Sequence, residues 1–115
     1  MRGESSFLDW REQSYPRWMQ PADIYHSQAL GTNAVHHGAY RVLAEMAKAL
    51  DEPSAAWTTR ADSIRAGIAA HLWQPALGWH AQFRYGRASM TVSPRAEALG
   101  EALALVYGAT PAARR

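Results

Sequence analysis

The stretch Thr32-Asn33-Ala34-Val35-His36-His37-Gly38-Ala39-Tyr40-Arg41-Val42-Leu43-Ala44-Glu45-Met46-Ala47-Lys48-Ala49-Leu50 decides the fold class of this 115-residue chain. Its apolar residues recur every three or four positions, the spacing of one helical face, at Val35, Ala39, Val42, Leu43, Met46, Ala47 and Leu50. Thr32 is the expected N-cap, because a threonine hydroxyl can accept a free N–H of the first turn. We therefore predict an amphipathic helix from Thr32 to Leu50.

A second helix is predicted directly after the first. The run Asp51-Glu52-Pro53-Ser54 ends one helix and begins the next, since proline suits a first turn and acidic groups suit the positive end of the helix dipole. The second helix runs from about Pro53 to Leu72, with an apolar face made by Trp57, Ala61, Ile64, Ile68 and Leu72. Residues 32–72 thus form a helical hairpin, with Asp62 and Arg65 as a solvated surface pair.

The C-terminal part predicts one β-hairpin and a third helix. Residues 79–85 alternate, with Trp79, Ala81, Phe83 and Tyr85 on one side, and residues 86–89 can turn this strand back into 90–92. Ser93 and Pro94 are the expected N-cap and first residue of a helix over 93–108, ended by Gly108. Together with an irregular segment over residues 1–31, the fold class is mainly α with one short β-hairpin.

The irregular N-terminal segment contains the candidate site, which runs from Glu4 to Trp18. Aromatic, charged and hydroxyl side chains occur close together there, without helical or strand periodicity. Asp9 lies between Leu8 and Trp10, and desolvation there would raise the pKa of its carboxyl group towards the range of a general acid. Arg11 and Glu12 follow at once. Flat rings beside a few polar groups are typical of sugar sites, and they are supplied by Trp10, Tyr15 and Trp18. The alternative is a structural loop in which Asp9 caps a helix and the tryptophans fill the core.

The order Glu4, Ser5, Asp9, Arg17, Trp18 resembles the acid-bearing loop of the six-hairpin glycosidases. This (α/α)6-barrel superfamily includes trehalases, glucoamylases and glycogen-debranching enzymes, and trehalases carry the run Glu-Ser-Gly-Trp-Asp-Phe-Ser-Ser-Arg-Trp. In the present chain an apolar pair precedes the aspartate and the spacing to the Arg-Trp pair is longer. The resemblance therefore indicates the superfamily and leaves the family open. Residues 93–102 are also similar to inner-helix starts in bacterial members.

The resemblance implies a glycoside hydrolase, mostly inverting in this group, acting on an α-glucoside-type saccharide, with Asp9 as general acid. It also implies helical hairpins of an incomplete (α/α)6 toroid, since three long helices are about a quarter of such a barrel. We expect a fragment that is inactive alone and that needs the remaining hairpins of the full-length chain, one of which carries the base. Asn33, Arg95 and Glu97 would line the pocket near the inner-helix starts; the local alternative makes them a cap and ordinary helix-end charges.

Several other function classes lack support in the sequence. A net charge of +2 with scattered arginines gives no basic face for nucleic acid, and no apolar run approaches the roughly 20 residues that cross a membrane. His36 and His37 are adjacent and point in different directions from a helix, so no metal site is expected, and no cofactor motif is evident. The absence of cysteine leaves the compartment undetermined.

A non-enzymatic reading also remains open. Aromatic residues and arginine are enriched at interface hot spots, so Trp10, Tyr15 and Trp18 could instead form the binding patch of a helical protein-interaction module.

Overall fold

The computed structural model of the chain describes residues 1–2 and 17–110. In order along the chain the elements are α1 (Pro21–His26), β1 (Gln28–Ala29), α2 (Leu30–Ala49), α3 (Ala55–His71), β2 (Trp73–Gln74), β3 (Trp79–His80), β4 (Phe83–Tyr85), β5 (Thr91–Val92) and α4 (Ala98–Val106). The described part is mainly helical with a few short antiparallel strands, which confirms the mainly α class. None of its helices is both long and apolar enough to cross a membrane.

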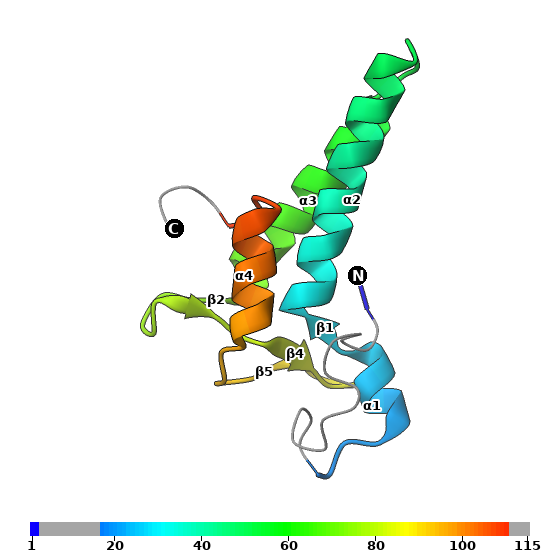
Figure 1. Cartoon of the computed structure of the whole chain (residues 1–115). Helices are drawn as coiled ribbons and strands as arrows, with labels where there is room; N and C mark the ends of the chain where they lie inside the picture. The colour runs from blue at the N-terminus through cyan, green and yellow to red at the C-terminus, as the bar shows by residue number, and fades with distance from the viewer. Residues whose placement is uncertain (3–16, 111–115) are drawn as a thin grey trace.

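The helical hairpin predicted over residues 32–72 is formed by α2 and α3. The two helices run side by side in opposite directions, and α4 packs against the N-terminal half of α2 (Figure 1). The chain reverses at Asp51, whose φ of 55° is left-handed, and the N–H of Glu52 donates to the carbonyl of Ala47 at 2.8 Å. Such bonds satisfy carbonyls that a helix end leaves free.

Small residues let α2 and α4 approach closely. A Cβ atom added to Gly100 would lie 3.4 Å from the backbone nitrogen of Gly31, and one added to Gly38 would lie 2.4 Å from the ring of Tyr107. The first turns of the two helices therefore meet directly. The main core fills the space around this contact with Leu30, Ala34, Ile68, Leu72, Ala81, Ala104 and Ala109.

The apolar stripe predicted on α2 is only partly buried among the described residues. Val42, Met46 and Leu50 are 57%, 54% and 70% exposed. The face that α2 turns to α3 and α4 consists mostly of small residues near the start of the helix. In the apolar face predicted for α3, Ala61, Ile68 and Leu72 are almost completely buried, whereas Trp57 and Ile64 are half-buried.

The strand predicted over residues 79–85 is divided in two. β3 pairs with β2, whereas β4 pairs with both β1 and β5, so that Arg84 lies opposite Gln28 on one side and Val92 on the other. The break occurs because Ala81 and Gln82 donate their backbone N–H groups to Leu72 and Arg95, at 2.7 Å each. The predicted alternation fails there, since residues 80–83 are all buried. The hairpin with residues 91 and 92 is confirmed.

The predicted start of α2 is wrong by two residues. The helix begins at Leu30 with Ala29 as N-cap, and Thr32 lies inside the first turn. No side chain of the described residues caps the start of α2. Instead, the first N–H of the helix, that of Leu30, forms a tertiary hydrogen bond to the carbonyl of Gln82 at 2.9 Å.

The predicted start of the third helix is also wrong. α4 begins at Ala98, and its N-cap is Glu97. Ser93 and Pro94 lie outside the helix because the backbone around them is held at the sheet: Ser93 donates to Phe83 at 2.9 Å, and Arg95 accepts from Gln82 at 2.7 Å. The predicted end is confirmed, since Gly108 adopts a left-handed φ of 70° after the last turn.

The expectation of an irregular segment through residue 31 is wrong for residues 21–26, which form α1. Pro21 occupies the first turn, where its missing N–H costs nothing. The carboxylate of Asp23 accepts the N–H of Gln20 at 3.0 Å, and it also pairs with Arg87 at 2.7 Å.

Candidate functional site

Five of the predicted site residues, Asp9, Trp10, Arg11, Glu12 and Tyr15, lie outside the described residues. The structure places the other four, which are Trp18, Asn33, Arg95 and Glu97.

Trp18, the last residue of the candidate loop, presents an aromatic surface. Its side chain is 57% exposed, and its ring centroid lies 5.4 Å from that of Tyr85 on β4, at an interplanar angle of 54°. Tyr85 in turn contacts Phe83 at 5.6 Å. We call Trp18 and Tyr85 the aromatic pair. It rests on a small core of Met19, Ala29 and Phe83, with Ile24 and Tyr85 packed against it. Tyr85 thus packs on this small core, whereas the Trp18 ring stays exposed to solvent, as a sugar-stacking surface requires.

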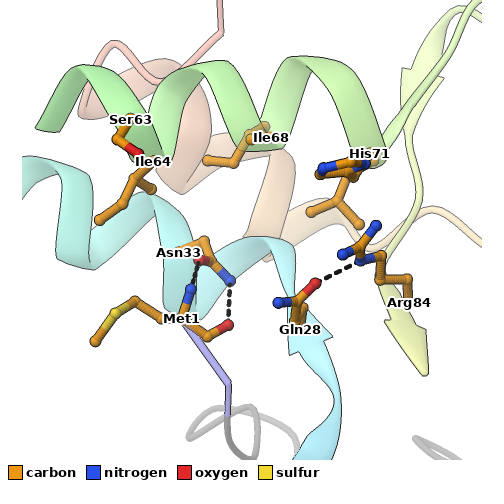
Figure 2. A pocket seen from close by; sticks show the side chains of 10 residues that line it. Met1, Gln28, Asn33, Ser63, Ile64, Ile68, His71 and Arg84 are labelled. Atoms are coloured by element: carbon orange, nitrogen blue, oxygen red, sulfur yellow. Dashed lines mark hydrogen bonds between the residues drawn. The ribbon is translucent and has the colours of Figure 1, made fainter. Parts of the chain in front are cut away.

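Asn33 lies in the first turn of α2, where its side chain is buried. Its amide nitrogen donates to the carbonyl of Ala29 at 2.8 Å, and its amide oxygen accepts the terminal amino group of Met1 at 2.8 Å. Burial of that amino group lowers its pKa, with further lowering by the neighbouring charges of Arg2 and Arg84. Asn33 thus makes local bonds at the helix start and also lines a cavity (Figure 2).

Glu97 and Arg95 precede the first turn of α4. The carboxylate of Glu97 accepts the N–H of Leu99 at 2.9 Å and also that of Gly100. These bonds match the local alternative, in which Glu97 serves the helix end. Arg95 has an exposed side chain. Although the first turns of α2 and α4 meet, no contact between the side chains of Asn33, Arg95 and Glu97 is found in residues 17–110.

Two polar contacts between distant residues were not predicted. His80 is fully buried, and its ring contacts the carboxylate of Glu101 on α4. Arg84 on β4 donates through Nε to the side-chain oxygen of Gln28 on β1. A sequence signal for the second contact exists, because paired strands place opposed side chains together. The first depends on how β3 meets α4, which no local pattern encodes.

The adjacent histidines are held by backbone carbonyls. The Nδ1 atom of His37, which is buried, lies 2.8 Å from the carbonyl oxygen of Ala61, and Nδ1 of His36 lies 2.8 Å from that of Thr32. Within the described ranges, no group of three or more His, Asp or Glu side chains is arranged to hold a metal ion.

Comparison with known protein families gives a match over most of the chain. A family model described as the mannosylglycerate hydrolase MGH1-like glycoside hydrolase domain matches residues 5–114. No curated protein and no solved structure matches the chain.

Proposed function

Because the chain belongs to the mannosylglycerate hydrolase MGH1-like glycoside hydrolase domain family, we propose that it supplies the acid-bearing part of a glycoside hydrolase. The family match over residues 5–114 carries this proposal, since it includes the candidate loop from residue 5 as well as the helices that follow it in the sequence. Asp9 acts as the general acid and protonates the glycosidic oxygen as the bond to the leaving group breaks.

The proposed reaction proceeds with inversion. An inverting enzyme needs a second carboxylate about 6.5–9.5 Å from the acid, so that a water molecule fits between that base and the sugar. Glu12 follows Asp9 too closely along the chain to be assigned to the opposite face of the sugar. We infer that the base is a carboxylate on another helical hairpin of the (α/α)6 barrel.

The aromatic pair supports the sugar beside Asp9. A pyranose ring has apolar C–H faces that stack on exposed rings, and Trp18 offers such a ring 57% exposed and buttressed by Tyr85. Trp10 and Tyr15 add further rings, and Arg11 and Glu12 bind hydroxyl groups. Asn33, Arg95 and Glu97 contribute from the starts of α2 and α4.

The exposed stripe on α2 supports a larger helical assembly. Fully burying an exposed side chain of this kind yields about 1.5–3 kcal/mol. Val42, Met46 and Leu50 are more than half exposed, so covering them would yield at least about half of that each. We infer that further helical hairpins cover this stripe and complete an (α/α)6 toroid.

The substrate is a saccharide joined through an O-glycosidic bond, of the α-glucoside type. The family description also names mannosylglycerate, so both kinds of glycoside belong in an assay of the full-length protein. Product anomers are followed by NMR immediately after mixing. We expect the anomer first released to be opposite in configuration to the substrate. Release of the retained anomer would refute inversion, and no hydrolysis of any glycoside would favour the non-enzymatic interaction module.

A further inference from the structure

A cavity of about 220 Å³ lies between α2, α3 and the strands β1 and β4 (Figure 2). Its lining residues are Met1, Gln28, Asn33, Ser63, Ile64, Gly67, Ile68, His71, Leu72 and Arg84. An apolar cavity of about 150 Å³ is enough to hold a benzene molecule. The space here is therefore large enough for a small organic ligand.

The walls of the cavity differ in polarity. α3 contributes the apolar side chains of Ile64 and Ile68, followed by Leu72 just after the helix. The opposite side carries the polar groups of Gln28 and Arg84. Pockets that combine an apolar wall with a few placed polar groups are typical of small-molecule sites.

Arg84 and the terminal amino group of Met1 give the cavity positive charge. The Nε atom of Arg84 donates to Gln28, which orients the guanidinium, and Figure 2 shows this group at the same end of the cavity as His71. No acidic side chain lines the cavity among the described residues. Two other arginines in that part of the chain do have carboxylate partners, Arg65 with Asp62 at 3.0 Å and Arg87 with Asp23 at 2.7 Å.

The terminal nitrogens of Arg84 have no recorded partner in residues 1–2 and 17–110. A guanidinium carries five N–H donors, and its planar fork matches a carboxylate in two parallel hydrogen bonds. Positive charge is also concentrated nearby, since the charge of Arg84 contributes to the lowered pKa of the Met1 amino group. Among the described residues, the cavity therefore presents a half-buried guanidinium whose terminal N–H groups are available to a ligand.

We propose that this cavity binds a small organic carboxylate, with the carboxylate on the guanidinium of Arg84 and the apolar part of the ligand against Ile64 and Ile68. The guanidinium of Arg84 and the aromatic pair lie on opposite faces of β4. Arg84 and Tyr85 are consecutive on β4, and successive side chains of a strand point to opposite faces. The strand pairing agrees, because Gln28 lies opposite Arg84 whereas Ala29, which packs under the aromatic pair, lies opposite Phe83. The proposal does not depend on glycosidase activity.

Benzoate and its neutral analogue benzamide test the proposal on the ¹⁵N-labelled full-length protein. They have nearly the same shape, but only benzoate carries a charge. We expect benzoate to cause saturable NMR shifts at the Nε–H of Arg84 and at the amides of Gln28 and Ile68, with a Kd on the order of 1 mM. Benzamide should bind at least about 10-fold more weakly, because it lacks the charge-assisted bonds. Equal binding of the two probes, or no saturable shift with benzoate, would overturn the proposal.

Two variants and one control locate the site. Arg84→Gln removes the charge and should weaken benzoate binding by about 10-fold or more. Arg65→Gln is the control: both Arg65 and its partner Asp62 are exposed, so the Kd should stay within about twofold. Gly67→Leu provides a second route, since a Cβ at Gly67 meets nothing within 4 Å and the added side chain would fill the cavity. Loss of binding in Gly67→Leu is expected even if Arg84→Gln fails to fold. Unchanged binding in either folded variant would place the ligand elsewhere and refute the proposal.

Discussion

The Nδ1 atom of His80 lies 3.0 Å from Oε2 of Glu101, and the other oxygen of the same carboxylate accepts the backbone N–H of His80 at 2.5 Å. The imidazole is fully buried, and its ring meets the edge of Trp73 at 5.0 Å between centroids. The carboxylate of Glu101, on the first turn of α4, thus binds β3. The two residues in contact are 21 positions apart in sequence. This contact holds the strand region against the helix whose start meets α2.

Removing that carboxylate should destabilise the fold. In Glu101→Ala the backbone N–H and the ring nitrogen of His80 stay buried without their acceptor, at a cost of about 2 kcal/mol. Urea unfolding followed by circular dichroism measures the loss. Glu45→Ala is the matched control, because Glu45 pairs with Lys48 at the surface with its side chain 72% exposed, and its change should stay below about 0.5 kcal/mol. Equal losses in both variants would show that the contact with His80 contributes nothing.

Two helix glycines should respond oppositely to alanine. In Gly38→Ala the new Cβ would lie 2.4 Å from the ring of Tyr107, so α4 or the ring must move, which costs about 1–3 kcal/mol. In Gly67→Ala the Cβ has open space, and a better helix former should add about 0.5–1 kcal/mol. Thermal and urea unfolding of both variants measure whether each substitution lowers or raises the free energy of unfolding. A stabilising Gly38→Ala would contradict the close packing of α2 on α4.

The sequence predicted the long helices well and their starts poorly. The period of apolar residues identified α2 and α3, and Gly108 marked the end of the third helix, because these signals are local. The starts of α2 and α4 depend instead on backbone bonds from Gln82, which lies far away in sequence. Thr32 and Ser93 look like caps by residue type. The N–H of Leu30, however, donates to Gln82 where α2 actually starts, and the N–H of Ser93 donates to Phe83 outside α4.

The candidate site was less predictable than the fold. Trp18 was predicted as a ring for sugar stacking, with core filling as the alternative, but its partner Tyr85 lies 67 residues later and was assigned only to a strand face. Glu97 was placed near an inner-helix start, and its capping bonds to Leu99 and Gly100 could not be told from a ligand role by spacing alone. The periodicity of apolar residues and the composition indicate only local structure, whereas these contacts depend on how β4 and α4 pack in the tertiary fold.

The aromatic pair should affect substrate binding more than turnover. In the full-length enzyme, Tyr85→Ala removes the buttress of the Trp18 ring and should raise KM by about 5- to 10-fold with a smaller change in kcat, since stacking contributes about 0.5–1.5 kcal/mol. Tyr85→Phe keeps the ring and should behave like the wild type. The control is Trp79→Ala, on β3 and 40% exposed. A KM that rises equally in the control would remove Tyr85 from the sugar site.

The 115-residue chain on its own should be inactive and prone to associate. Val42, Met46 and Leu50 leave a contiguous apolar stripe exposed on α2, and such patches promote association. Light scattering coupled to gel filtration should show species larger than the monomer. Val42→Lys with Met46→Glu should shift the chain towards the monomer. A monomeric wild-type chain, or measurable hydrolysis by it, would contradict this expectation.

The role of Asp9 as general acid is tested most directly by turnover of Asp9→Asn in the full-length enzyme, measured on a natural saccharide and on an activated aryl glycoside. Asparagine keeps the size of the side chain and cannot donate the acid proton. Turnover of the natural saccharide should therefore fall by about 100- to 10,000-fold, while the aryl glycoside, whose leaving group departs without protonation, is largely spared. Unchanged turnover of the saccharide in Asp9→Asn, together with its loss in Glu12→Gln, would contradict the assignment and make Glu12 the acid.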